Sequence, residues 1–236
     1  MWRMIGPLMV WFLAAGLVHA GPWPREAGQT FLSLSGERDR SGNAYTGLYA
    51  EYGLTGRRTL GAEVTRTTVG ETGVMIWYQK SLDDGEGAYQ LSYSMGFGAL
   101  HRDGALLPQS QAALMLGRGF SGLWDGGWLT AEARIKVAGE PRQIIQRDGL
   151  SQTEAAYLTP QMIGKLDLTA GIRPTPDWAI INQLRLESRQ DSDFQAKLAS
   201  SIVYDIVGPA RLEAGVVTPL AGPGEAALKL GTWFDF

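Results

Sequence analysis

The feature that most constrains this chain is an alternation of apolar and polar residues that runs through most of residues 21–236. Strict alternation places successive side chains on opposite faces of a strand. In residues 89–99 one face carries Tyr, Leu, Met, Phe and Ala, and the other carries Gln, Ser and Gly. Residues 129–137, 194–205 and 226–236 repeat the pattern. No stretch after residue 20 has a convincing helical period, so we predict an all-β protein.

The two faces differ in the same way in strand after strand. One face carries Leu, Val, Ile, Ala and aromatic residues, and the other carries Gly, Ser, Thr, Gln and paired charges. Segments of about ten residues with this pattern, separated by turns, are typical of a transmembrane β-barrel. A soluble sandwich also alternates, but its strands are usually shorter and face a shared core. Because every backbone polar group must be paired in lipid, the sheet must close. We therefore predict an antiparallel up-and-down transmembrane β-barrel.

The number of strands follows from the phase of the alternation. A first count finds thirteen segments, whereas bacterial single-chain barrels have even strand numbers. Segments 151–159 and 162–172 keep one unbroken phase, so they form one strand and make one long extracellular hairpin, 127–172, with its turn near 147–150. Pro160 removes a ladder donor and is expected to mark a bulge. The twelve predicted strands are 29–35, 44–54, 58–68, 73–82, 87–99, 109–119, 127–147, 151–172, 178–188, 194–205, 210–219 and 225–236.

The first twenty residues have the layout of a secretory signal peptide. Arg3 precedes an apolar stretch, residues 5–18, and Val-His-Ala precedes Gly21 as a cleavage site. A retained membrane anchor is the alternative. We therefore predict a signal peptide, 1–20, and a single barrel domain, 21–236. Residues 21–26 are expected to form a short periplasmic lead-in, and the alternative is a small plug inside the barrel with Trp23 as its anchor.

Composition excludes several classes of function. The chain has no cysteine, which excludes disulfides, zinc–thiolate sites and thiol chemistry. Its mean hydropathy of -0.09 is too polar for a bundle of membrane helices. The net charge is -3, so no overall field favours nucleic acid as a partner.

The last residues of the chain carry a resemblance. Residues 231–236 read Gly-Thr-Trp-Phe-Asp-Phe, and a terminal phenylalanine that closes an alternating strand resembles the end of Gram-negative outer-membrane barrels. The resemblance implies a place in the outer membrane of a Gram-negative bacterium, with outer-membrane lipid and lipopolysaccharide around the barrel. It also implies that Trp233, Phe234 and Phe236 form a signal that the barrel-assembly machinery reads. Residues 49–63, YAEYGLTGRRTLGAE, are similar to a hairpin of barrels associated with meta-pathway phenol degradation, but we transfer no substrate from that hairpin.

The predicted inward face carries many charges, and these are the candidate lumen-lining or constriction residues. Bases exceed acids by eight to six. One interpretation is an interior whose charges pair with one another, since buried ions need partners. The other is a water-filled constriction with a slight anion preference, because rings of basic residues select anions in pores. Glycines on the early strands are expected to leave room there. The charges are Glu51, Glu63, Glu132, Arg134, Lys136, Lys165, Asp167, Arg173, Arg185, Glu187, Lys197, Arg211, Glu213 and Lys229.

The leading prediction is a narrow passive or weakly selective channel for small solutes, with no cofactor. The alternative is a closed barrel that acts through its outer loops, in adhesion, envelope structure or hydrolysis. Hydrolysis would need a general base, and after removal of residues 1–20, which contain His19, the remaining histidine is His101. It lies in a predicted outer loop at 100–108, two residues before Asp103. One histidine and scattered carboxylates form no specific set of metal ligands. We therefore predict no enzyme activity, no catalytic residue and no metal site.

Aromatic residues near the predicted periplasmic strand ends are expected to form an interfacial girdle. They are Phe120, Trp128, Trp178, Tyr204 and Phe234.

Overall fold

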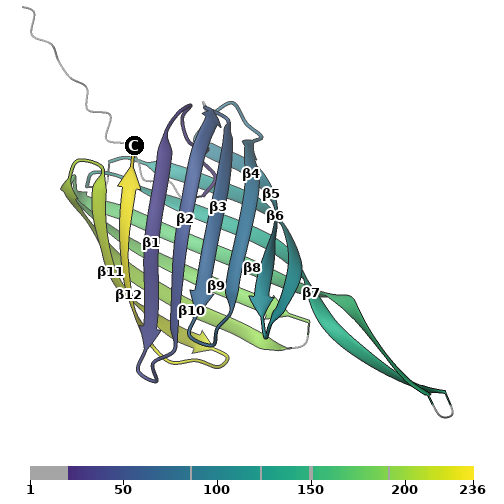
Figure 1. The fold of residues 1–236 in the computed structure, drawn as a ribbon. Coiled ribbons are helices and arrows are strands. Elements are labelled where there is room, and N and C mark those ends of the chain that lie inside the picture. Colours follow the sequence, from purple (N-terminus) through teal and green to yellow (C-terminus); the bar gives the residue numbers. More distant parts are fainter. Residues whose placement is uncertain (1–20, 86, 123, 149–150, 191) are drawn as a thin grey trace, which may run out of the picture.

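The computed structural model describes residues 21–236 except 86, 123, 149–150 and 191, and of residues 140–148, 151–157, 192 and 207 it describes the backbone alone. Within this part, twelve antiparallel strands form one closed barrel (Figure 1). No helix among the described residues is long and apolar enough to cross a membrane. The strands are β1 (Thr30–Asp39), β2 (Ala44–Thr55), β3 (Arg58–Thr67), β4 (Thr72–Ser81), β5 (Tyr89–Arg102), β6 (Ala105–Phe120), β7 (Gly127–Asp148), β8 (Ser151–Thr175), β9 (Trp178–Arg189), β10 (Ser192–Val207), β11 (Ala210–Ala221) and β12 (Ala227–Asp235).

Each strand pairs with the next one in the chain, and β12 returns to pair with β1. This last ladder runs from Phe31 opposite Asp235 to Asp39 opposite Ala227. The N–H of Thr30 donates to the carbonyl of Phe236 at 2.9 Å, and the N–H of Phe236 donates to that of Thr30 at 2.8 Å. No sheet edge is therefore left open at the seam. The predicted fold class, with twelve strands, is confirmed.

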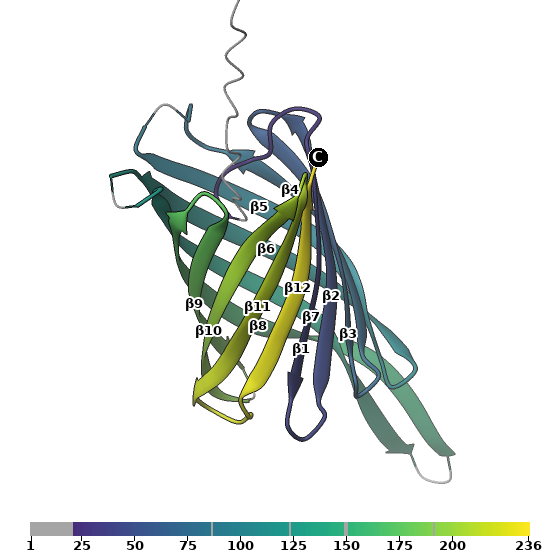
Figure 2. The same ribbon diagram turned by 90° about the vertical axis from the view of Figure 1, so that its left-hand side faces the viewer.

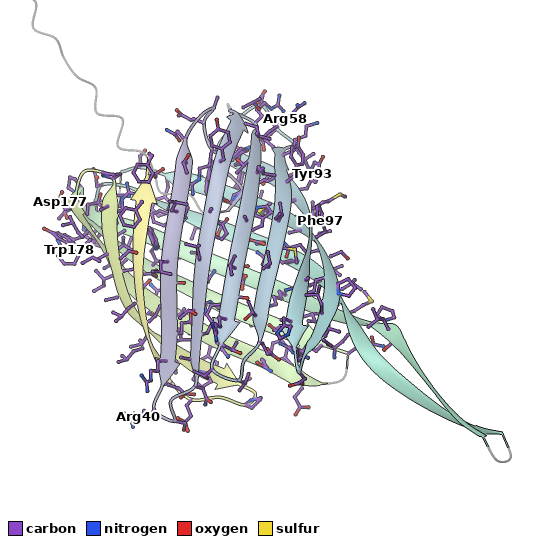
Figure 3. The ribbon with its side chains drawn as sticks, in the orientation of Figure 1. Arg40, Arg58, Tyr93, Phe97, Asp177 and Trp178 are labelled. Atoms are coloured by element: carbon purple, nitrogen blue, oxygen red, sulfur yellow. The ribbon has the colours of Figure 1, made fainter. Side chains whose placement is uncertain are left out.

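The ends of the barrel differ, and we name them by what lies there. The proximal mouth is the end at which Thr30 and Phe236 lie, and the distal mouth is the opposite end, from which the β7–β8 hairpin projects (Figures 1 and 2). Figure 3 places Arg58 and Asp177 at the proximal mouth and Arg40 at the distal mouth. The prediction that the proximal mouth is periplasmic stays a prediction.

The long hairpin is a continuous ladder. β7 and β8 pair without a register shift from Gly127 opposite Ile172 to Asp148 opposite Ser151. The predicted bulge at Pro160 is therefore wrong. β9 begins to pair with β8 only at Ile163, so Pro160 lies where β8 has a single neighbouring strand. Proline is tolerated at such an edge because no second ladder needs its N–H.

The outer wall of the barrel is apolar and the inner wall is polar. On β5, Met95 and Phe97 are 62% and 71% exposed, whereas Ser92 and Ser94 are 0% and 5% exposed. Figure 3 shows Tyr93 and Phe97 on the outside of this wall. The polarity is inverted relative to a soluble protein, which is the arrangement expected of a barrel in lipid.

Two distal loops are shorter than predicted. β1 extends to Asp39, so residues 36–39, half of the predicted loop 36–43, are strand. The β5–β6 ladder continues to Arg102 opposite Ala105. Asp103 and Gly104 close it with φ values of 49° and 76°, as the two central residues of a type I′ turn require. The expected loop 100–108 is therefore a tight hairpin.

Candidate functional site: the barrel lumen

The strand register defines the inward face. Residues directly opposite one another in an antiparallel pair point to the same face. Fully buried Ser92 lies opposite Met115, which lies opposite Glu132, and Glu132 continues to Asp167 and Arg185. The same relation, followed around the closed ladder, places on the inward face Glu51, Glu63, Arg134, Lys136, Lys165, Glu187, Lys197, Arg211, Glu213 and Lys229.

Arg173 lies near the proximal turn, past the last regular β8–β9 pair. It is 6% exposed, and its Nη1 donates to the carbonyl of Pro176 at 3.1 Å. It therefore holds the turn, and among the described residues it forms no ion pair with the inward charges named above.

The inward face also carries charges that the sequence reasoning did not select. Glu37, Asp205 and Asp235 add three acids and Arg189 adds one base. These additions cancel the predicted excess of two bases, so the lumen is close to neutral. The alternation carries this signal, but Glu37 and Arg189 lie just outside the predicted strands 29–35 and 178–188, and the two aspartates lie at strand ends.

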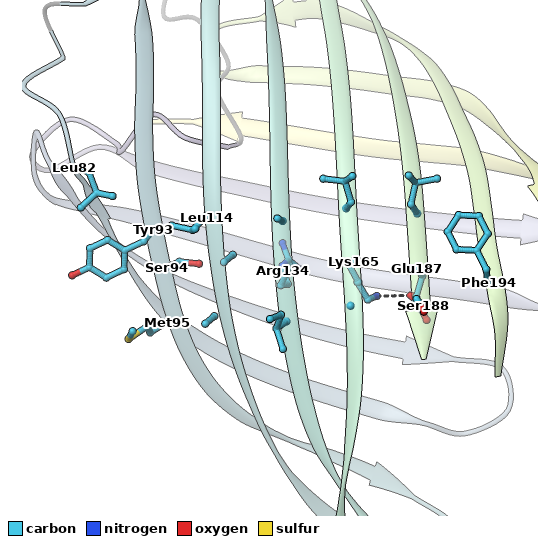
Figure 4. Close-up of a pocket in the computed structure, with 17 residues that line it drawn as sticks. Leu82, Tyr93, Ser94, Met95, Leu114, Arg134, Lys165, Glu187, Ser188 and Phe194 are labelled. Carbon is cyan, nitrogen blue, oxygen red and sulfur yellow. Dashed lines mark ion pairs between the residues drawn. The ribbon is translucent and has the colours of Figure 1, made fainter. Parts of the chain in front are cut away.

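Neighbouring strands of one wall carry charges of the same sign. Glu132 lies opposite Asp167, and two residues further along, Arg134 lies opposite Lys165. The negative row, Glu132 and Asp167, lies next to the positive row, Arg134 and Lys165, so their charges offset each other. Arg134 forms an ion pair with Glu132 on its own strand. Lys165 Nζ lies 2.8 Å from Glu187 Oε2 on β9 (Figure 4).

Further ion pairs connect more distant parts of the lumen. Arg185 on β9 donates from Nη1 to Glu37 Oε1 on β1 at 2.8 Å, across the interior. Glu213, 3% exposed, accepts from Lys229 Nζ at 2.6 Å, and Ser201 Oγ and Trp233 Nε1 complete its shell at 2.7 and 3.2 Å. Among the described side chains, Lys136, Lys197 and Asp167 form no ion pair.

Residues 21–28, which we call the plug segment, enter the lumen at the proximal mouth. Pro22 is fully buried. The carbonyl of Gly21 accepts from Gln79 Nε2 at 2.8 Å. Trp23 packs against a buried cluster of Trp128, Ala179 and Val203. The interpretation of this segment as a periplasmic lead-in is therefore wrong, and the structure favours the alternative of a plug with Trp23 as its anchor.

Inward glycines accommodate this plug segment and an aromatic ring. A Cβ at Gly53 would lie 1.8 Å from the carbonyl oxygen of Glu26, and one at Gly117 would lie 2.3 Å from Pro22 Cγ. A Cβ at Gly61 would lie 2.1 Å from Trp77 Cε2. The expectation that glycines leave empty space is therefore wrong at these positions, because other groups fill it.

Aromatic side chains line the inside of the barrel near the plug segment. Tyr49 lies 5.0 Å from Trp77 and 6.1 Å from Phe31 between ring centroids, and Phe31 lies 6.2 Å from Trp233. Trp128 is 5% exposed and also faces inward, so its assignment to the interfacial girdle is wrong. Its even position on β7 places it on the opposite face from Leu129.

Other aromatic residues lie on the outer wall. Trp178 and Tyr204 are exposed and lie 4.5 Å apart between ring centroids, as a girdle would require. Phe234 and Phe236 stack at 6.3 Å near the proximal mouth. Trp233 points to the inside, so the three residues of the predicted assembly signal do not share one face.

Three cavities lined by described residues lie along the lumen. One of about 310 Å³ is lined by Pro22, Glu132 and Lys229, and one of about 160 Å³ is lined by Glu63, Lys136 and Lys165. A third, of about 40 Å³, lies against Trp77 and Gln79. Arg134 lines all three, so its side chain lies where the three cavities approach one another.

A groove of about 760 Å³ lies on the outer wall (Figure 4). Its lining includes the outward side chains of Tyr93, Met95 and Phe194, and it also touches inward positions such as Arg134 and Lys165. Because it opens away from the lumen and is almost wholly apolar, it belongs to the surface that would face lipid.

The proposed hydrolytic pair does not form. His101 lies on β5 opposite Thr72 and Leu106 and points outward, and Asp103 occupies the tight turn. No hydrogen bond or ion pair joins the two among the described residues. Nor do these residues contain a group of three or more His, Asp or Glu side chains placed to hold a metal ion.

Comparison with known proteins identifies the fold. No family model and no curated protein sequence matches the chain, so the likeness of residues 49–63 to phenol-degradation barrels stays a prediction. Among solved structures, the KdgM porin has a TM-score of 0.60 at 9% identity, covering 87% of this chain and 99% of that one. The NanC porin has a TM-score of 0.60 at 14% identity, covering 86% of this chain and 98% of that one. The outer membrane protein Omp33 of Acinetobacter baumannii has a TM-score of 0.54 at 9% identity, covering 89% of this chain and 98% of that one. The chain, a closed barrel of twelve strands, therefore has the fold of outer-membrane porin barrels.

Proposed function

We propose that this protein is a narrow, weakly selective outer-membrane channel for small solutes. The observation that carries the proposal is the series of cavities with charged side chains in their lining, inside a closed barrel whose outer wall is apolar. A barrel packed with side chains along its whole length would need no such cavities. The likeness in fold to porins supports the same conclusion.

The selectivity we propose is weak and local. The inward charges nearly balance, so no strong overall preference is expected. The cavity of about 160 Å³ is the exception, because Arg134, Lys136 and Lys165 line it against one acid, Glu63. Lys136 forms no ion pair with the described residues, so its charge remains available to a passing anion. Small anions are therefore expected to enter this cavity more readily than cations.

Conductance across planar lipid bilayers tests the channel. The folded protein should give discrete conductance steps, and the reversal potential in a KCl gradient should show a slight chloride preference. Lys136→Glu should move that potential toward potassium, whereas Lys80→Glu, which lies outside the lumen, should not. A complete absence of steps would refute the proposal.

The second candidate is a closed barrel with a structural or adhesive role. The plug segment favours it, because Pro22 and Trp23 fill the proximal part of the lumen. The same bilayer measurement separates the two candidates, since a closed barrel conducts nothing under any voltage or salt gradient.

We also propose a place in the outer membrane of a Gram-negative bacterium, after removal of residues 1–20. The apolar outer wall requires lipid, and lipopolysaccharide would contact its distal part. Phe234 and Phe236 would be the residues that the assembly machinery reads, because both lie on the outer side near the proximal mouth. N-terminal sequencing of protein from the outer-membrane fraction should begin at Gly21, and recovery from the soluble periplasm would contradict the proposal.

A further inference from the structure

We propose that the plug segment is a gate that Arg25 latches to the seam of the barrel. This inference rests on the proposed channel function and concerns how the proximal end of the lumen opens. The segment bounds the cavity of about 310 Å³ through Gly21 and Pro22. Its withdrawal would therefore join that cavity to the proximal mouth.

Arg25 has contacts on four strands. Its backbone N–H donates to Thr59 Oγ1 on β3 at 2.8 Å, and its Nε donates to Glu51 Oε2 on β2 at 2.7 Å. Its Nη1 lies 3.9 Å from Asp235 Oδ2 on β12, and its guanidinium lies 4.3 Å from the ring centroid of Phe31 on β1. The side chain thus spans the junction of the first and last strands.

The Arg25–Glu51 pair is deeply buried. The two side chains are 5% and 4% exposed. Removing one partner of such a pair leaves the other as an uncompensated buried charge, which is strongly disfavoured. Loss of the Arg25 charge should therefore weaken the docked position far more than loss of an exposed residue would.

Backbone contacts hold the two ends of the segment. Pro22 and Pro24 have no N–H to donate, and Gly21 is held through its carbonyl by Gln79. Past the latch, Gly28 donates to the carbonyl of Gly53 at 2.8 Å, which fixes the base of the segment to β2. The geometry is that of a short arm fixed at Gly28, latched at Arg25 and packed at its far end by Trp23.

The absence of cysteine from the natural chain gives a direct probe of docking. Pro22→Cys places a thiol at a fully buried position, and Ala27→Cys places one at an exposed position of the same segment. In the folded protein, a charged methanethiosulfonate reagent should label the thiol at position 27 rapidly and the thiol at position 22 slowly. Adding Arg25→Ala should raise the labelling rate at position 22 at least tenfold, and Arg25→Lys should raise it less.

The conductance of the same variants tests the gate. Arg25→Ala should raise the open probability or the mean conductance at least threefold over the natural chain. Arg57→Ala, on the exposed β2–β3 turn, should leave both unchanged. A heat-modifiable band on an unboiled gel establishes that each variant is folded, and Glu51→Gln gives a second way to break the latch.

The outcomes distinguish a failure of the proposed gate from a failure of the proposed channel function. Rapid labelling at position 22 while Arg25 is intact would overturn docking itself. Faster labelling in Arg25→Ala with a conductance equal to that of a conducting natural chain would overturn the gate and leave the channel intact. Faster labelling with no conductance in any variant would overturn both the gate and the proposed function.

Discussion

The close approach of Gly61 to Trp77 leads to a quantitative prediction. A Cβ at position 61 would lie 2.1 Å from Trp77 Cε2, whereas ordinary contacts begin near 3.4 Å, so Gly61→Ala must displace the indole by about 1.3 Å. Trp77 is 7% exposed and lies 5.0 Å from the ring of Tyr49, which restricts that movement. Overpacking of this kind costs about 1–3 kcal/mol of unfolding free energy.

Gly119→Ala is the matched control. Gly119 also lies on an inward strand position, but a Cβ there would meet nothing within 4 Å. Alanine in a strand is about 0.5–1 kcal/mol more favourable than glycine, so this variant should equal or exceed the natural chain. Urea unfolding in lipid vesicles, followed by tryptophan fluorescence and by gel mobility, measures both.

A second substitution tests the cause of the effect. Trp77→Phe removes Nε1 and Cζ2, two of the atoms closest to the new methyl group. Trp77→Phe should therefore lower the free energy of unfolding less in the Gly61→Ala background than in the natural chain, since the effects of contacting residues are not additive. If Gly61→Ala proves as stable as Gly119→Ala, the packing described for this wall is wrong.

Three further predictions concern other parts of the lumen and the hairpin. Trp233→Phe removes the donor to Glu213 Oε2 and should cost about 1–3 kcal/mol; an unchanged urea midpoint would contradict that contact. Glu37→Gln weakens the contact with Arg185 across the lumen and should raise bilayer conductance, so an unchanged or lower conductance would show that this contact does not restrict flow. Deletion of residues 141–158, with Asn-Gly joining the remaining strands, should still give a heat-modifiable barrel, since those residues pair only with one another; failure to fold would show that the hairpin stabilises the barrel.

The fold could be predicted because the alternation is a local property. Each strand shows both its faces within about ten residues, and lipid outside with water inside makes the faces differ strongly. The inward charges followed from the same parity. The distal loops were predicted too long because β1 and β5 continue through Glu37 and His101, beyond the apolar belt of the outer wall. Polar residues also occur on the outer face there, so the contrast between the two faces no longer marks a strand.

The plug segment and its contacts could not be derived in this way. Arg25 contacts Glu51 and Asp235, and Pro22 packs against Gly117. In each of these contacts the two residues are distant in the chain. A short stretch with two prolines has no periodicity from which a position could be inferred. The glycine-rich inward face offered the only signal, since a close approach of backbone or rings is one reason for glycine in a strand.

The alternation of lipid exposure along β7 tests the central claim most directly. Single cysteines at positions 129–135 of this cysteine-free chain can carry a fluorophore, and the protein can be reconstituted into bilayers of brominated lipid. The odd positions, which include Leu129 and Ile135 at 50% and 54% exposure, should be quenched strongly, and the even positions, from Thr130 to Arg134, should be quenched little. Equal quenching at all seven positions, or stronger quenching at the even ones, would contradict a barrel with an apolar wall in lipid and a polar lumen.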